Sequence, residues 1–175
     1  MIAMAPLLSL TQRSEHAGWG VFACRTGQDQ EGPFYKADAP FRKIIEASGT
    51  PLRIEGIVFK GSDCSTTIAN AVIDIWHCND EGEYDMKGFN CRAQTKTDAN
   101  GRYDFLTILP PSYGSRPRHI HFKIRAQGFQ ELTTQLYFKG DPHITNDFAR
   151  NAEQDRIISL KKETKYQKGL FNIYL

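Results

Sequence analysis

Two histidines, His119 and His121, lie close together in the segment "RPRHIHF" at 116–122. Residues i and i+2 of a β-strand point to the same face, so both imidazoles could bind one metal ion. The residues that follow continue the alternation of polar and apolar side chains, which is also typical of a strand whose polar face meets solvent. Taken alone, the solvent-facing interpretation is the more common one, so a metal site requires further ligands.

Two tyrosines near these histidines could complete such a site. Tyr84 lies in the segment "NDEGEYD", and Tyr113 follows two prolines. A tyrosine is a poor zinc ligand at neutral pH because its ordinary pKa is about 10, whereas ferric iron can bind phenolate. Each tyrosine taken alone is more often a half-buried loop aromatic. If both are ligands, the chemistry that they indicate is that of ferric iron.

The sequence contains no other familiar metal motif. There is no H-E-x-x-H motif, and the four cysteines form no C-x-x-C pair, which argues against a zinc knuckle or a thioredoxin-like motif. Asp98 and Asp104 lie in or beside a predicted turn, which explains them without a metal. Cys78 and Cys91 bracket one loop, so they either close it as a disulfide or remain free buried thiols.

The elements that must position these residues are predicted to be short strands. Gly56 interrupts the alternation of the first strand and predicts a bulge there. Only residues 146–160 have much helical character. Many short strands between turn signals indicate an antiparallel sandwich or barrel. Runs rich in β-branched and aromatic residues predict strands at 52–60, 71–76, 103–108, 119–126, 133–138 and 170–175.

Length and composition limit the class of protein. The chain has 175 residues, enough for one domain, and we expect an irregular N-terminal segment at 1–30 and a single domain at 31–175. Its net charge is only +2 and its basic residues are scattered, so nucleic acid is not an expected partner. No apolar run reaches the roughly 20 residues of a membrane span. We expect a cytoplasmic protein, with an exported form as the alternative, because the apolar N-terminus lacks a preceding basic residue.

Five ordered segments of the sequence resemble the intradiol ring-cleavage dioxygenases, a family that includes catechol 1,2-dioxygenase and protocatechuate 3,4-dioxygenase. Five blocks in the same order are far more specific than any single motif, and together they cover residues 31–142. The segments are "EGPFYKADAP" (31–40), "ANAVIDIWHCNDEGEYD" (69–85), "TDANGRYDFLTILPPSYG" (97–114), "RPRHIHF" (116–122) and "LTTQLYFKGDP" (132–142).

The resemblance implies an all-β fold, namely an antiparallel β-sandwich of the intradiol dioxygenase type with long active-site loops and little helix. It also implies a mononuclear, non-haem Fe(III) cofactor whose ligands are Tyr84, Tyr113, His119 and His121. The implied reaction inserts both atoms of O2 into a catechol-type aromatic to give a muconic diacid. Tyr113 is expected to be catalytic as well, because the tyrosine at this position leaves the metal and can take up a substrate proton.

Further site residues are implied on the substrate side. We expect Arg116 and Gln135 to be catalytic and Phe34 and Tyr35 to bind the substrate ring. The guanidinium of Arg116 is always charged and would stabilise negative charge on that ring. The expected partners are a small aromatic diol and O2, and a homodimer is a further expectation. The segment before "GPFY" is too short for the helical dimerisation region of catechol 1,2-dioxygenases, so we do not expect their mode of dimerisation.

Three alternatives stay open at this point: a non-catalytic β-sandwich that binds a ligand or protein, an intradiol-like protein that has lost activity, and a zinc or other metal hydrolase, for which no carboxylate ligand can be placed. The substrate is also open. Lys36, Arg42 or Arg53 could meet a substrate carboxylate, although each is more commonly a solvated surface charge. Arg118, in a position where relatives usually have alanine, has no assigned role.

Overall fold

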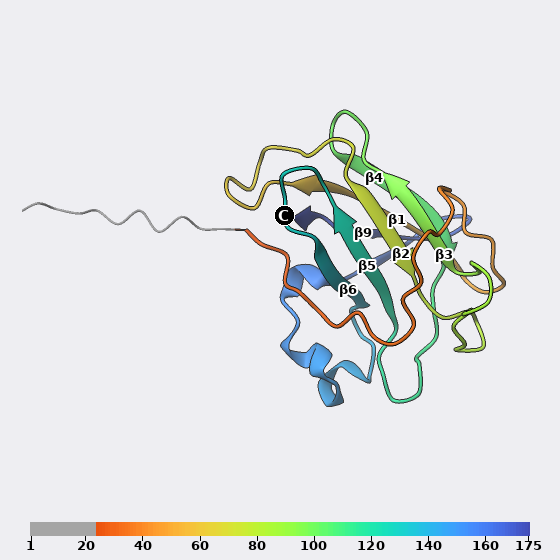
Figure 1. The fold of residues 1–175 in the computed structure, drawn as a ribbon. Helices are drawn as coiled ribbons and strands as arrows, with labels where there is room; N and C mark the ends of the chain where they lie inside the picture. Colours follow the sequence, from red (N-terminus) through yellow and green to blue (C-terminus); the bar gives the residue numbers. More distant parts are fainter. Residues whose placement is uncertain (1–23) are drawn as a thin grey trace, which may run out of the picture.

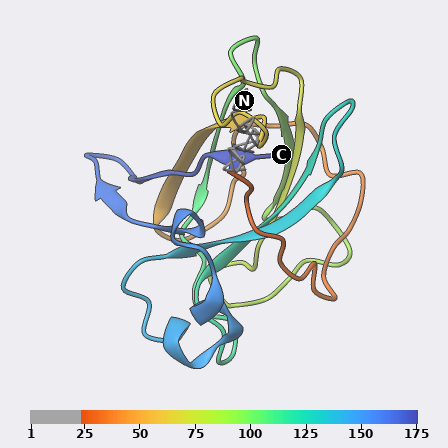
Figure 2. The same cartoon turned by 90° about the vertical axis from the view of Figure 1, so that its left-hand side faces the viewer.

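Two β-sheets packed face to face make up the fold of residues 24–175, the part of the chain that the computed structural model describes (Figures 1 and 2). One sheet has the strand order β3-β2-β5-β6-β7, and the other has the order β10-β1-β9-β8, with β4 also paired to β1. The strands are β1 (Pro51–Phe59), β2 (Val72–Trp76), β3 (Arg92–Lys96), β4 (Arg102–Ile108), β5 (His119–Arg125), β6 (Leu132–Phe138), β7 (Ile157–Ile158), β8 (Leu160–Lys162), β9 (Gln167–Leu170) and β10 (Ile173–Tyr174).

The predicted sandwich with little helix is confirmed. The helical segments of residues 24–175 are three short 3₁₀ helices, η1 (Ile144–Asn146), η2 (Phe148–Asn151) and η3 (Gln154–Arg156). Most strand pairs are antiparallel, and the parallel ones join β1 to β9, β1 to β10, and β6 to β7. One apolar cluster fills the space between the sheets, with Leu52 and Ile54 of β1 facing Ile120 and Phe122 of β5. Its members are fully buried, so this core fixes which face of β5 points outward.

The bulge predicted at Gly56 is wrong. The pairing of β1 with β4 continues without a break from Pro51 opposite Ile108 to Ile57 opposite Arg102. The residue is glycine because a Cβ there would lie 1.8 Å from the carbonyl oxygen of Phe171. The close approach of the chain between β9 and β10, rather than a shift in phase, excludes a side chain at this position.

The helix predicted at 146–160 is also wrong. This segment forms η2, η3 and β7, and then continues into β8. Its hydrogen bonds run from residue i+3 to residue i, as from Arg150 N to Asp147 O, and the chain is already extended at Ala152. Tertiary contacts override helix propensity here, because Arg156 is drawn into a buried ion pair.

Strand β3 was not predicted, because "RAQTK" has only one β-branched residue, Thr95, and only one apolar residue, Ala93, too few to signal a strand. It forms through its pairing with β2, from Val72 opposite Lys96 to Trp76 opposite Arg92. The strand predicted at 170–175 is divided into β9 and β10. Asn172 lies at the break, and its side chain accepts a hydrogen bond from Ile57 N at 3.1 Å.

The segment 24–41 covers the outer face of the sheet that contains β5 (Figure 1). Asp29 N donates to Thr133 O of β6, and further along Gln94 N of β3 donates to Pro40 O. Residues 24–30 contain no strand, and the rest of the predicted irregular segment 1–30 lies outside the described residues. This cover explains why the polar face of β5 is buried instead of meeting solvent.

A buried ion pair anchors this covering segment. Asp29 Oδ2 lies 2.5 Å from Arg156 Nη1, and both side chains are less than a tenth exposed. Arg156 Nε also meets Glu153 at 2.8 Å, but the Glu153 side chain is 55% exposed. The first pair therefore joins the N-terminal cover to η3 in a desolvated place, whereas the second lies largely in water.

A disulfide joins Cys24 to Cys64, so the covering segment is also linked covalently to the loop after β1. Cys78 and Cys91 are free and buried, which confirms the free-thiol alternative for that pair. Among the described residues, no helix is long and apolar enough to cross a membrane.

We predict that Gly56→Ala destabilises the fold by about 3 kcal/mol, because the added methyl group cannot fit beside Phe171 O. Urea unfolding followed by tryptophan fluorescence measures this. The matched control is Gly140→Ala, where φ is +87° and nothing lies within 4 Å, so only backbone strain of about 1 kcal/mol is expected. Equal costs for the two variants would contradict the steric explanation.

We also predict that Asp29→Ala lowers the free energy of unfolding by roughly 3 to 5 kcal/mol, because it leaves the Arg156 guanidinium buried without its partner. Glu153→Ala, which removes the exposed partner of the same arginine, should cost less than about 1 kcal/mol. Hydrogen exchange of the amides at 26–34 should quicken in the first variant and not in the second. Similar behaviour of both variants would mean that the ion pair does not anchor the segment.

Candidate metal centre

Three elements bring the predicted metal ligands together. His119 and His121 lie on β5, Tyr84 lies in the loop between β2 and β3, and Tyr113 lies in the loop between β4 and β5. The Tyr84 hydroxyl is 3.1 Å from His119 Nε2 and 3.3 Å from His121 Nε2. The Tyr113 ring stands edge-on to the Tyr84 ring, with 5.5 Å between centroids. All four residues belong to one cluster, and three of them meet through their polar atoms.

Contacts other than those with Tyr84 orient the two imidazole rings. His119 Nδ1 donates to the carbonyl oxygen of Pro117 at 2.7 Å, so in the neutral ring Nε2 carries the lone pair and faces Tyr84. The His121 ring stacks on Trp76 with 4.8 Å between centroids and 7° between planes. Trp76 is the cross-strand partner of His121 on β2, so the pairing of the strands itself supplies this support.

Burial sets the protonation of the cluster. It lowers the pKa of His119 to about 4 and holds the pKa of His121 well below its ordinary value, so both imidazoles are neutral at physiological pH. Burial raises the pKa of the Tyr84 phenol, which therefore needs a nearby cation in order to ionise. Within residues 24–175 no group of three or more His, Cys, Asp or Glu side chains could hold a metal. The donors are thus neutral imidazoles and phenols, a set that fits a highly charged cation such as Fe(III).

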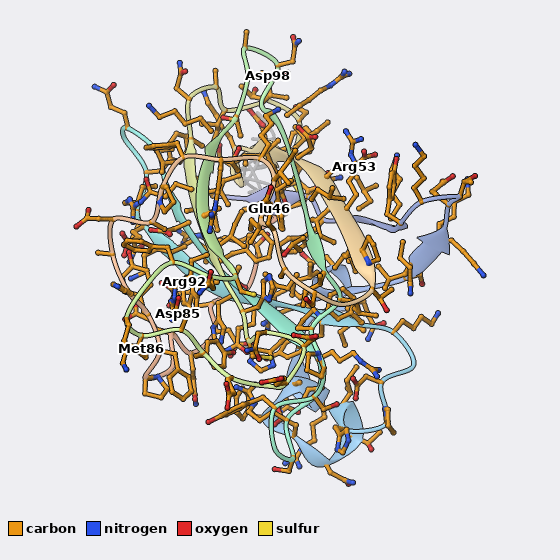
Figure 3. The ribbon with its side chains drawn as sticks, turned by 90° about the vertical axis from the view of Figure 1, so that its right-hand side faces the viewer. Glu46, Arg53, Asp85, Met86, Arg92 and Asp98 are labelled. Carbon is orange, nitrogen blue, oxygen red and sulfur yellow. A yellow bond between two sulfur atoms is a disulfide. The ribbon has the colours of Figure 1, made fainter. Side chains whose placement is uncertain are left out.

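Strand β3 holds the loop that carries Tyr84 (Figure 3). The buried guanidinium of Arg92 donates from Nε to Asp85 O at 2.9 Å and from Nη2 to Met86 Sδ at 3.4 Å. The Asp85 carboxylate in turn accepts hydrogen bonds from three backbone N–H groups at 87–90. The loop is long but internally bonded, so Tyr84 has a fixed place.

The two residues predicted to bind the substrate ring lie in different surroundings. Phe34 stacks on Tyr84 with 4.4 Å between centroids and stands edge-on to Tyr113 at 5.6 Å. Tyr35 instead packs on Trp76, and its hydroxyl donates to the Asp74 carboxylate at 3.1 Å. Phe34 is therefore part of the cluster, whereas Tyr35 supports the indole that lies behind His121.

Arg116 and Gln135, both predicted to be catalytic, are hydrogen-bonded to each other. Arg116 Nη2 donates to Gln135 Oε1 at 3.2 Å, and Gln135 Nε2 donates to Gln30 O at 2.6 Å. Gln135 is the cross-strand partner of His121 on β6. The sheet register therefore places this amide beside a predicted ligand.

Two neighbours of Arg116 were not predicted from the sequence. The buried Tyr137 hydroxyl accepts from Arg116 Nη2 at 3.3 Å and donates to Asp29 at 3.0 Å, and the Asp147 carboxylate pairs with the guanidinium. Tyr137 follows Gln135 by two residues on a predicted strand, so its period-two spacing could have revealed it. Asp147 gave no such signal, because its segment was predicted to be helical.

Four cations whose roles were open have partners elsewhere. Lys36 and Arg42 donate to backbone carbonyls within residues 87–92, and Arg53 pairs with a carboxylate on β4, in the other sheet. Arg118 is structural: its backbone N–H donates to the buried Asp141 carboxylate at 3.0 Å, and its guanidinium lies 3.5 Å from the same group. This carboxylate ties the start of β5 to the loop after β6.

Comparisons with known proteins show the family of this chain. A family model described as Dioxygenase matches residues 30–116 and 112–174. Catechol 1,2-dioxygenase 2 of Acinetobacter lwoffii is 34% identical over 168 residues, which cover 79% of this chain and 60% of that protein. Chlorocatechol 1,2-dioxygenase of Pseudomonas sp. (strain P51) is 31% identical over 161 residues, which cover 76% and 63%. The chain thus spans less than two thirds of the length of these relatives.

Solved structures show the same fold. The dioxygenase domain of a dioxygenase and carbohydrate-binding protein fusion from Streptomyces sp. SirexAA-E has a TM-score of 0.80 and 35% identity, and the match covers 86% of this chain and 97% of that one. Catechol 1,2-dioxygenase from Pseudomonas arvilla C-1 has a TM-score of 0.72 and 28% identity, with coverage of 87% and 62%. From the family model and these relatives, the chain belongs to the intradiol dioxygenase family.

Proposed function

We propose that this protein is an Fe(III)-dependent intradiol dioxygenase that inserts both atoms of O2 into a catechol-type aromatic to give a muconic diacid. The observation that carries the proposal is the convergence of the Tyr84 hydroxyl with Nε2 of His119 and of His121, within 3.3 Å, where residues 24–175 provide no carboxylate cluster. Two relatives at 34% and 31% identity are named as catechol and chlorocatechol 1,2-dioxygenases, which supports the same reaction class.

Tyr84, Tyr113, His119 and His121 would hold the iron. When bound, ferric iron would withdraw electron density from a coordinated catechol and make its ring reactive toward O2. The neutral imidazoles can bind a cation without first losing a proton, whereas each phenol must lose one. Because its donors are held by β5 and by a bonded loop, the centre is largely preorganised.

Tyr113 is the residue best suited to leave the metal and accept a substrate proton. It lies in a tight turn that Arg116 N closes by donating to Tyr113 O at 2.9 Å, and Gly114 at φ +57° follows it. Its hydroxyl makes no hydrogen bond with the described residues, in contrast to that of Tyr84. A phenol on a half-exposed turn can swing away while the other ligands stay in place.

The surrounding side chains would bind and orient the ring. Phe34 offers an aromatic wall beside both tyrosines, and Arg116 offers a fixed positive charge for negative charge that develops on the ring. Gln135 sets hydrogen bonding beside the same place. The direct contact predicted between Tyr35 and the substrate stays a prediction; the contacts of Tyr35 with Trp76 and Asp74 favour a supporting role.

The charges around the site favour a catechol without a carboxylate. Lys36, Arg42 and Arg53, the cations that could have met such a group, are bonded to backbone carbonyls or paired on the other sheet. The Cys24–Cys64 disulfide favours the exported alternative over a cytoplasmic location, because disulfides persist in oxidising compartments. The homodimer stays a prediction.

We predict that iron-loaded protein shows a visible tyrosinate-to-iron charge-transfer band, and that anaerobic addition of catechol shifts it. Tyr84→Phe should lower the iron content and remove most of the band, because it deletes the donor that meets both imidazoles. The matched control is Tyr166→Phe, at a residue that lies beside Arg53 of the other sheet. This variant should keep both the iron content and the band. Iron-loaded wild-type protein without the band would contradict the ligand assignment.

We predict that Arg116→Ala retains iron and colour but lowers turnover of catechol by roughly a hundredfold or more, because a fixed positive charge beside the ring is lost. Oxygen uptake and muconate absorbance measure turnover. Arg118→Ala serves as the control, since that guanidinium is half-exposed and its backbone contact with Asp141 remains. Near-normal turnover in Arg116→Ala would remove Arg116 from the reaction.

A further inference from the structure

The guanidinium of Arg116 is held on one edge by the carboxylate of Asp147. Nε donates to Oδ2 at 3.1 Å and Nη2 donates to Oδ1 at 3.4 Å, so two nitrogens face two oxygens. The side chains are 22% and 9% exposed. A two-point pair in such surroundings fixes both the direction and the rotation of a guanidinium, which a single ion contact does not do.

Asp147 is itself fixed by its own turn. Its Oδ1 accepts a hydrogen bond from Ala149 N at 2.9 Å, which makes Asp147 the N-cap of η2. Its backbone N–H donates to the carbonyl oxygen of Ile144, the first residue of η1, and so closes that helix. Because the carboxylate is bonded on both sides, it cannot rotate freely toward solvent.

The same turn also covers one face of the guanidinium. The ring centroid of Phe148, the residue after Asp147, lies 4.0 Å from Arg116 Cζ. On the remaining side, Nη2 meets Gln135 Oε1 and the Tyr137 hydroxyl. Nη1 makes no hydrogen bond with the described residues, so it is the donor group that stays available to a ligand.

We propose that Asp147 is a positioning residue: it locks Arg116 so that Nη1 is presented to the substrate. This proposal rests on the dioxygenase function proposed above. An unrestrained Arg116 side chain would lose rotamer entropy during each binding event. Asp147 removes that cost in advance and keeps the positive charge at one point beside the ring.

The competing explanation is that Asp147 only caps η2. Asp147→Asn separates the two roles, because Asn keeps an oxygen for Ala149 N but places an amide N–H₂ against the Arg116 donor. A matched control is Arg150→Ala, which removes an exposed cation from the same turn. Neither change touches a proposed iron ligand.

We expect Asp147→Asn to lower kcat/KM for catechol by about 10- to 100-fold, with iron content, charge-transfer band and melting temperature close to those of Arg150→Ala. The decisive measurement is a double-mutant cycle. Asp147→Asn added to Arg116→Ala should cause no further loss, because Asp147 acts through the guanidinium. Two outcomes would overturn the proposal: a double variant whose loss is the product of the two single losses, or a normal kcat/KM for Asp147→Asn.

A second measurement does not depend on iron or turnover. In iron-free protein, the Nε–H proton of Arg116 should give a slowly exchanging NMR signal that Asp147→Asn abolishes and Arg150→Ala preserves. An Arg116 signal that is unchanged in Asp147→Asn would contradict the proposal that Asp147 fixes the Arg116 side chain. If the wild-type protein lacks both colour and turnover, the dioxygenase function fails, and the lock is then decided by this NMR signal alone.

Discussion

The candidate site depends on the burial of the polar face of β5. A strand with apolar side chains on one face and histidines and a lysine on the other would ordinarily place the second face in water. Here β2 and β6 flank the strand, and the segment 24–41 crosses over it, so His119, His121 and Lys123 are nearly inaccessible. Desolvation then requires a partner for each polar group, and those partners orient the site.

Each partner is supplied by a different part of the chain. Pro117 receives the Nδ1 proton of His119, Trp76 stacks on His121, and Glu31 pairs with Lys123. The consequence is that Nε2 of each imidazole meets the Tyr84 hydroxyl, at 3.1 Å for His119 and 3.3 Å for His121. The point where the Tyr84 hydroxyl meets the two Nε2 atoms is therefore the place on this dry face where a bound cation would find its donors.

The sequence was sufficient for the sandwich, which depends on local patterns, and for the grouping of the proposed ligands, which the family resemblance implied. Alternation along "HIHFKIRA" is a property of neighbouring residues, and the order of five segments carried the family. It was not sufficient where long-range contacts decide. Position 56 must be glycine because a side chain there would clash with the backbone of Phe171. Strand β3 forms because it pairs with β2. Residues 146–160 do not form one helix, because Arg156 pairs with Asp29. The solvent exposure of β5 was likewise decided by a segment about 90 residues away.

The parallel pairing of β1 with β9 and β10 has a kinetic consequence. Ile57 meets Asn172 across 115 positions, and Asp29 meets Arg156 across 127. Loops of this length must close before their contacts stabilise anything, so folding should be slow for a chain of this size and should end with the last strands. Until those residues are available, β1 has one unpaired edge that can associate with other chains. Because Asp29 of the covering segment is anchored by Arg156, the cover over β5 would be completed only after residue 156 is available.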